Sequence, residues 1–125
     1  MPNVVTGWIY DLLKNAVLTG GAVKVESSDK GKNAAAHESV TIDATAGGVG
    51  LTALTYGTNR YAFITCETAQ IRFTTDGTAP TAANGHILNP GDILHLDSAA
   101  DIAAFKGFRT GATSGVIKVT YSGVA

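Results

Sequence analysis

The sequence predicts a mainly β protein: an antiparallel β-sandwich or jelly roll of about eight short strands, preceded by an N-terminal helix or arm. Apolar and polar residues alternate in short runs over most of the chain, which is the period of a half-buried strand. These runs recur roughly every 8–12 residues, with Gly, Pro, Asn and Asp between them. Strand and helix patterns do not alternate, so no parallel sheet is expected. The 125 residues suffice for one domain with its own core.

The first 21 residues differ from the rest and are predicted to be a separate interface element. Two apolar series with a spacing of four indicate one face of a helix over about residues 7–18: Trp8, Leu12 and Ala16, and Ile9, Leu13 and Val17. An extended arm that is ordered only against a neighbouring chain is the alternative. In either case the candidate contact residues are Trp8, Ile9, Leu12 and Leu13, and residues 22–125 form the β domain.

The strand pattern appears in short runs from residue 22 onward. These runs are residues 22–26, 40–43, 51–55, 60–67, 71–73, 86–88, 93–97 and 116–121. Residues 27–36 are predicted to be a polar loop, and residues 101–105 one helical turn or a loop. Residues 108–115 are predicted to lead into a turn that precedes the last strand.

Two of these runs indicate where the core lies. In the run 60–67 both faces are largely apolar, as in a central strand of a sandwich. One face carries Tyr61, Phe63 and Thr65, and the other carries Ala62, Ile64 and Cys66. In the run 116–121, the side chains expected to face the core are Ile117, Val119 and Tyr121.

Five residues are predicted to have structural roles in turns. Asp76 is expected to cap its turn by accepting hydrogen bonds from nearby backbone N–H groups, and Gly77 to adopt a positive φ. Pro80 is expected to hold the following chain extended. Pro90 and Gly91 are the middle residues of the tight turn over residues 89–92.

Composition limits the classes of partner. Charged residues make up 15% of the chain, against about 25% in a typical domain, and the net charge is −1. This composition fits a protein that packs among neighbours, and it equally fits an ordinary Thr-rich β domain. No basic cluster indicates nucleic-acid binding, and no apolar run approaches the ~20 residues of a membrane span. The single Cys66, with no signal-peptide pattern at the N-terminus, predicts synthesis in a reducing cytosol.

The polar residues do not form a recognisable catalytic or metal-binding pattern. The three histidines, His37, His86 and His95, lack metal-ligand spacing, although the last two flank one turn and would approach each other across a hairpin. The aspartates lie in turns and form no calcium loop. Cys66 lies among apolar residues, where its thiol is expected to be inert. We therefore expect no enzyme, metal or cofactor, and a protein that works by binding and assembly.

One region of the chain resembles a known group of proteins. It contains a strand followed by Asp-Gly-Thr-x-Pro-Thr at residues 76–81, a Gly-Asp pair at 91–92, Phe-x-x-x-Arg-Thr-Gly at 105–111 and Val-x-Tyr at 119–121. Residues 70–122 thus resemble small virion proteins of tailed phages and prophages. The same Asp-Gly-Thr-x-Pro-Thr turn also resembles that of small β-sandwich modules appended to bacterial sugar-degrading enzymes.

The phage resemblance implies a head decoration, or cement, protein. Such a protein would bind the outside of a phage head and bridge capsid subunits. Its partners would be the major capsid protein and other copies of itself, in a trimer or dimer. It would be made in the host bacterial cytoplasm and end at the capsid surface of the virion. Residues 1–20 would then contact the shell or a sister subunit. The alternatives are a phage tail or fibre protein, or a carbohydrate-binding β-sandwich module that uses exposed Tyr or Trp.

Overall fold

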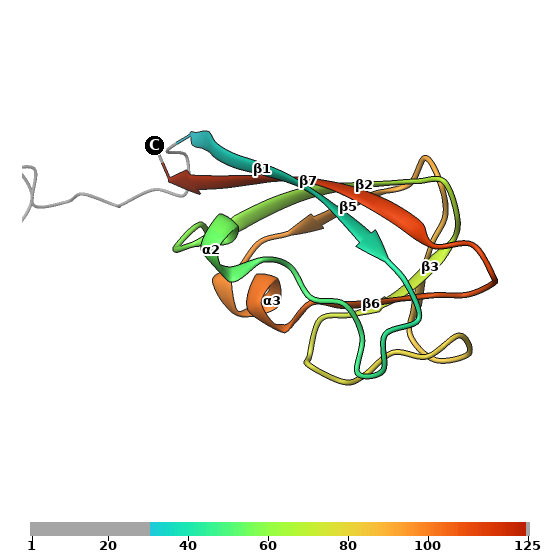
Figure 1. Cartoon of the computed structure of the whole chain (residues 1–125). Helices are drawn as coiled ribbons and strands as arrows, with labels where there is room; N and C mark the ends of the chain where they lie inside the picture. The colour runs from blue at the N-terminus through green and yellow to red at the C-terminus, as the bar shows by residue number, and fades with distance from the viewer. Residues whose placement is uncertain (1–30, 125) are drawn as a thin grey trace, which may run out of the picture. The chain divides into compact units, whose positions relative to one another are not determined.

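The computed structural model describes residues 31–124, which form two antiparallel sheets and two short helices (Figure 1). The strands are β1 (Lys32–Ile42), β2 (Tyr61–Glu67), β3 (Ile71–Thr74), β4 (His86–Leu88), β5 (Ile93–Leu96), β6 (Lys106–Arg109) and β7 (Gly115–Val124). The helices are α2 (Ala53–Tyr56) and α3 (Ala99–Ala104). The predicted mainly β fold is confirmed, and the two sheets are consistent with a sandwich.

The two sheets divide the strands unequally. The four-stranded sheet has the order β1-β7-β2-β5, and the three-stranded sheet has the order β4-β3-β6. Figure 1 shows them as two layers, with β1, β7, β2 and β5 in the upper one. β2 pairs with β7 on one side and with β5 on the other, so the prediction that it is a central strand is confirmed.

The core consists of the side chains that the two sheets and α3 turn toward each other. Its fully buried members are Ile42, Ile64, Ile71, Ile102, Phe105, Ile117, Val119 and Tyr121. The expected inward residues of the last strand are therefore confirmed, as is the inward face of β2, where Ala62, Ile64 and Cys66 are buried. Period-2 alternation was sufficient to identify both faces because alternate side chains of a strand point to opposite sides.

The prediction of a loop over residues 27–36 is wrong for its second half, because β1 begins at Lys32. The residues Ala34 to Ala36 carry no alternation of bulky apolar side chains, so no local pattern marks them as strand. They are strand because their backbone pairs with β7, with a register shift between Ala34 and Ala36. The predicted strand over residues 22–26 and the helix or arm over residues 1–21 lie outside the described residues.

Two further segments differ from their predictions. Residues 51–55 were expected to form a strand, but residues 53–56 form one helical turn, α2, in which Thr55 N and Tyr56 N both donate to Thr52 O at 2.9 Å. Residues 106–109 form the strand β6 beside β3. The residue pattern predicts only that residues 108–115 lead into a turn, whereas the resemblance to virion proteins implies a strand in the Phe-x-x-x-Arg-Thr-Gly segment at residues 105–111. Residues 101–105, predicted as a helical turn or a loop, lie mostly in the helix α3, which ends at Ala104. The Ser98 hydroxyl caps this helix by accepting a hydrogen bond from Asp101 N at 3.0 Å.

The turn over residues 89–92 joins the two sheets and does not close a hairpin. β4 pairs with β3, whereas β5 pairs with β2. The turn is closed by Asp92 N, which donates to Asn89 O at 2.9 Å, and it is held to the end of β2 by Gly91 N, which donates to Cys66 O at 2.8 Å. His86 and His95 consequently lie in different sheets, and the expectation that they would approach across a hairpin is wrong.

Candidate binding surface

The outer face of the four-stranded sheet carries exposed apolar side chains on β2 and β5. Register places Phe63 opposite His95, and Thr65 opposite Ile93. Phe63 is 43% exposed and Ile93 is 57% exposed, although side chains of this kind usually lie inside. The Phe63 and His95 rings meet edge to face, with centroids 5.2 Å apart. We call this set, Tyr61, Phe63, Ile93 and His95, the sheet-face patch.

The sheet-face patch changes one sequence interpretation. The two largely apolar faces of residues 60–67 predict a central strand of a sandwich, covered on both sides. Within residues 31–124 only the inner face of β2 is covered, because the second sheet packs on that side alone. The sequence signal for an exposed patch was present in the apolar residues of the outer face, but the alternation pattern does not say which faces are covered.

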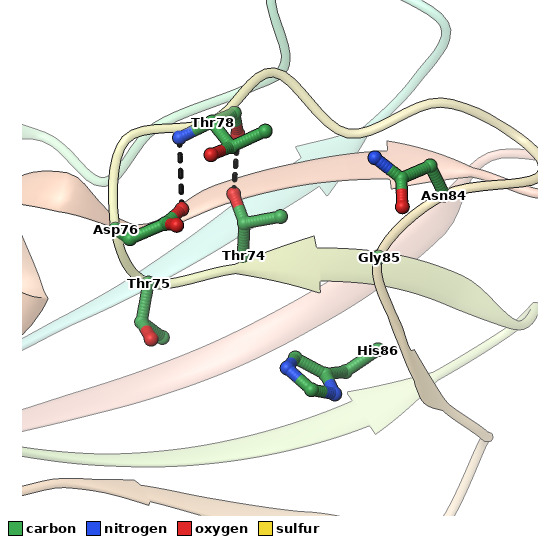
Figure 2. A pocket seen from close by; sticks show the side chains of 7 residues that line it. All are labelled: Thr74, Thr75, Asp76, Thr78, Asn84, Gly85 and His86. Atoms are coloured by element: carbon green, nitrogen blue, oxygen red, sulfur yellow. Dashed lines mark hydrogen bonds between the residues drawn. The ribbon is translucent and has the colours of Figure 1, made fainter.

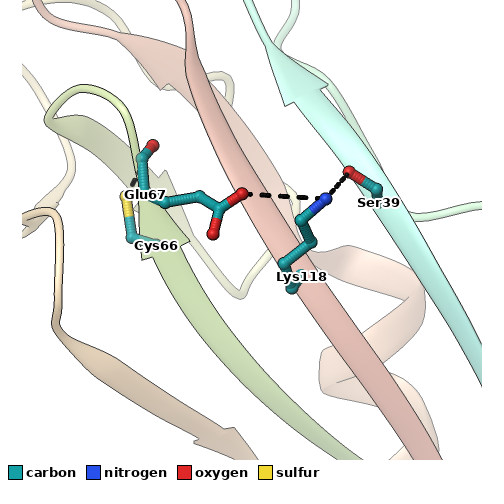
Figure 3. Close-up of polar contacts among 4 residues, drawn as sticks. All are labelled: Ser39, Cys66, Glu67 and Lys118. Atoms are coloured by element: carbon teal, nitrogen blue, oxygen red, sulfur yellow. Dashed lines mark hydrogen bonds and ion pairs between the residues drawn. The ribbon is translucent and has the colours of Figure 1, made fainter.

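The other half of the same face, on β1 and β7, is polar. His37 Nδ1 lies 3.1 Å from Thr120 Oγ1, and Lys118 Nζ donates to Ser39 Oγ at 2.9 Å. Figure 3 shows Lys118 reaching across to Glu67 as well, at 3.7 Å. An exposed ion pair of this kind adds at most about 1 kcal/mol to stability. The face is therefore divided into an apolar half and a hydrogen-bonded polar half.

A shallow hollow of about 190 Å³ lies at one end of the sheet-face patch. It is lined by Lys32, Tyr61, Ala62, Phe63, His95, Leu96, Asp97 and Ser122. The Lys32 Nζ atom lies over the Tyr61 ring, 4.1 Å from its centroid, which is a cation–π contact. The end of the patch thus offers aromatic surface bordered by one cation and one carboxylate.

A second hollow, of about 380 Å³, lies beside the Asp76 turn (Figure 2). Thr78 N donates to Asp76 Oδ1 at 2.9 Å, and the Thr74 hydroxyl donates to Thr78 O. Gly77 has a φ of 86°, which is a left-handed conformation that favours glycine. The backbone N–H of Thr78, followed by its side chain, lowers the pKa of Asp76 by hydrogen bonding to the carboxylate.

The other turn residues singled out by the sequence are part of the structure's close packing. Pro80 is fully buried, and its Cδ lies so close to Gly48 that a Cβ at that glycine would be 2.8 Å away. Gly91 has a φ of 90° in the turn between the sheets. These positions shape the domain and contribute no reactive group.

Cys66 lies near the C-terminal end of β2, on the inner face of the sheet, where it is buried. Its Sγ lies 3.4 Å from Ala69 O and 3.8 Å from Leu88 O. Burial, together with the nearby Asp92 and Glu67 carboxylates, raises the pKa of the Cys66 thiol above its ordinary value. The thiol is therefore protonated at neutral pH, a state in which it is a poor nucleophile.

Within residues 31–124, no three His, Cys, Asp or Glu side chains converge in a way that would hold a metal ion. The same part of the chain contains no helix long and apolar enough to cross a membrane. The candidate contact residues Trp8, Ile9, Leu12 and Leu13 lie outside the described residues.

No protein-family model, curated protein or solved structure matches this chain. The described residues therefore define a class of fold, a mainly β domain of two antiparallel sheets with one partly apolar exposed face, and they do not define a family.

Proposed function

We propose that this protein is a capsid decoration, or cement, protein that binds the outside of a phage head and stabilises it by bridging capsid subunits. The observation that carries the binding role is the sheet-face patch, where Phe63 on β2 and Ile93 on the neighbouring strand β5 are both exposed on the same face of the sheet. The resemblance of residues 70–122 to small virion proteins supports the head as the partner.

The sheet-face patch has the composition of a contact surface. Burying apolar surface gains roughly 25 cal/mol per Å², and aromatic residues are enriched at the centres of protein interfaces. The polar half of the face, with Ser39, Lys118 and Thr120, would form the hydrated rim of such an interface. The low charge of the chain, 15%, agrees with a protein that covers much of its surface by assembly.

One edge of β1, which has no ladder partner within residues 31–124, supports self-association. β1 is eleven residues long, and within residues 31–124 its only ladder partner is β7. A long edge strand presents unpaired backbone N–H and C=O groups that pair readily with another chain. A sister copy of this chain is the partner we assign to the β1 edge, and the capsid protein is the partner we assign to the sheet-face patch.

Binding to heads tests the proposed function. The proposed role implies that the genome encoding this protein also encodes a major capsid protein. Heads assembled from that capsid protein are mixed with the wild-type protein, and the bound fraction is measured by cosedimentation. We expect saturable binding that the double substitution Phe63→Ala and Ile93→Ala weakens at least about tenfold, because truncating central contact residues costs more than about 1 kcal/mol. Leu54→Ala is the matched control, since Leu54 is 98% exposed on α2.

Two outcomes would contradict the proposal. Heads that bind no wild-type protein would exclude the decoration role. Binding that the double variant retains in full, like the Leu54→Ala control, would show that the sheet-face patch is not the contact surface.

The aromatic content of the sheet-face patch favours a second candidate, a carbohydrate-binding module or a tail-fibre domain. Rings such as Tyr61 and Phe63 on a sheet face provide apolar surface against which a sugar ring can pack. This candidate predicts a monomer, or a fibre trimer, that binds glycans through Tyr61 and Phe63 and does not cosediment with heads. Sedimentation velocity together with a glycan array separates the two functions.

A further inference from the structure

We propose that the hollow beside the Asp76 turn binds a neutral saccharide, with one sugar ring seated between Asp76, Asn84 and His86. This site is separate from the sheet-face patch, and the inference does not depend on the head-binding role.

The hollow is formed where β3 ends and β4 begins. Register places His86 opposite Phe73, and their rings lie 5.4 Å apart at 41°, so the imidazole is supported from the core side. In Figure 2, Thr75 and Asp76 lie on one side, just after β3. Asn84, in the loop before β4, and His86, the first residue of β4, lie on the other side. At about 380 Å³ the hollow is within the range of roughly 300–1,000 Å³ that is typical of small-molecule sites.

The turn leaves several polar groups free for a ligand. Its own hydrogen bonds use the Thr74 hydroxyl, and the Asp76 carboxylate accepts from the backbone N–H of Thr78 at Oδ1 and from the Thr78 side chain, which leaves further lone pairs of this carboxylate open to the hollow. Asn84 bonds through its backbone N–H, which donates to Thr81 Oγ1 at 3.0 Å. Within residues 31–124, no protein group hydrogen-bonds to the Asn84 amide or to the His86 ring nitrogens. The hollow therefore presents a carboxylate oxygen, an amide and an imidazole.

The chemistry of the lining selects among ligand classes. No Lys or Arg lines the hollow, and the Asp76 carboxylate repels anions, so a phosphate or a carboxylate ligand is disfavoured. A divalent cation would find one carboxylate, fewer acidic groups than calcium sites normally use. Sugar hydroxyls both donate and accept hydrogen bonds, and they match a lining of carboxylate, amide, imidazole and threonine hydroxyl groups.

An NMR titration of the full chain tests the saccharide site. The ¹⁵N-labelled protein is titrated into the millimolar range with the methyl glycosides of glucose, galactose, mannose, N-acetylglucosamine and rhamnose, one at a time. We expect at least one glycoside to give saturable shifts confined to residues 74–86. Asn84→Ala should weaken that binding roughly tenfold, because it removes hydrogen bonds to the sugar.

Two further variants make the result specific. Asp76→Asn keeps an oxygen that can accept from Thr78 N while removing the charge, and it should weaken binding as well. Asp97→Asn is the matched control, because Asp97 lines the hollow on the sheet face, and it should leave the titration unchanged. Spectra of each variant without sugar establish that the fold is intact.

The proposal is overturned if none of the five glycosides gives saturable shifts, or if the shifts centre on Tyr61 and Phe63. Binding that both Asn84→Ala and Asp76→Asn leave unchanged would also overturn it. None of these results would affect cosedimentation with heads, so failure of the saccharide site is distinguishable from failure of the decoration role.

Discussion

Asp43 and Asp76 close two turns in the same way. In each case the carboxylate accepts a hydrogen bond of 2.9 Å from the backbone N–H two residues later, at Thr45 and Thr78. Hydrogen bonds from the Thr45 side chain and, to a smaller extent, its backbone N–H lower the pKa of the Asp43 carboxyl. For the Asp76 carboxyl, the backbone N–H of Thr78 lowers the pKa most, followed by the Thr78 side chain. Turn chemistry of this kind is local, so the sequence was sufficient to predict the role of Asp76.

The lowered pKa values predict a stability loss in acid. Each carboxyl titrates below its ordinary pKa of 3.8 in the folded state, so the unfolded chain binds more protons at low pH. The stabilisation is complete above about pH 4 and is lost as the pH falls through the lowered folded values. Urea unfolding measured over a pH series should show this fall, and the double variant Asp43→Asn and Asp76→Asn should show a smaller one. An equal fall in the variant would contradict the assignment.

The alternation pattern predicts which way the Tyr121 side chain points, but not the residue to which its hydroxyl bonds. Its inward orientation followed from alternation, but its hydroxyl donates to Glu38 Oε1 at 3.2 Å, and Glu38 is 83 positions away. The same carboxylate accepts from Thr52 N at 3.1 Å. Burial and the nearby Glu38 raise the pKa of the Tyr121 phenol. No local sequence signal connects Glu38 with Tyr121, because β1 and β7 meet only through long-range pairing.

At the scale of elements, a strand could be predicted from the residue pattern where large apolar side chains alternate with polar ones. β2, β3 and the middle of β7 carry large apolar side chains on one face, and their positions were predicted. Alternation gives no signal for β6 because its inward position is Gly107, where a Cβ would lie 3.0 Å from the Ile42 side chain. A strand whose inward residue is glycine has no apolar side chain at that position, so no alternation marks it in the sequence.

Gly115 at the start of β7 gives a direct test of this packing. A Cβ at this position would lie 2.7 Å from Ala69 O and would also overlap the Ile71 side chain. Gly115→Ala should therefore lower the free energy of unfolding by about 1–3 kcal/mol, as overpacked substitutions do. Gly111→Ala is the matched control: its Cβ would meet nothing within 4 Å, and its expected change is within about 0.5 kcal/mol. Equal urea midpoints for the two variants would contradict the packing argument.

At the scale of the whole molecule, the sequence predicts a 21-residue N-terminal element and a β domain. Residues 31–124 supply the two sheets, the sheet-face patch and the hollow beside the Asp76 turn. The N-terminal element supplies apolar residues in a repeating pattern, among them Trp8 and Leu12. The proposed decoration role requires contacts with the shell and with sister copies, and we propose that the N-terminal element makes part of them.

Deletion of residues 2–19 tests this division of roles. We expect the deleted protein to lose oligomers in sedimentation velocity and to bind heads at least about tenfold more weakly, because large apolar residues dominate interface energies. The full-length variant with alanine at Trp8, Ile9, Leu12 and Leu13 should behave in the same way. If oligomerisation and head binding both survive the deletion, the N-terminal element is not an interface.

The sequence by itself determined the mainly β class, the inward residues of β2 and β7, and the turn at Asp76. All of these depend on side-chain periodicity and on backbone preferences of neighbouring residues, which act over a few positions. Only the tertiary structure decided which strands pair, that the outer face with Phe63 and Ile93 is left uncovered within residues 31–124, and that Asn84 and His86 face Asp76 across a hollow. These features depend on contacts between distant segments, and no local pattern records which segments will meet.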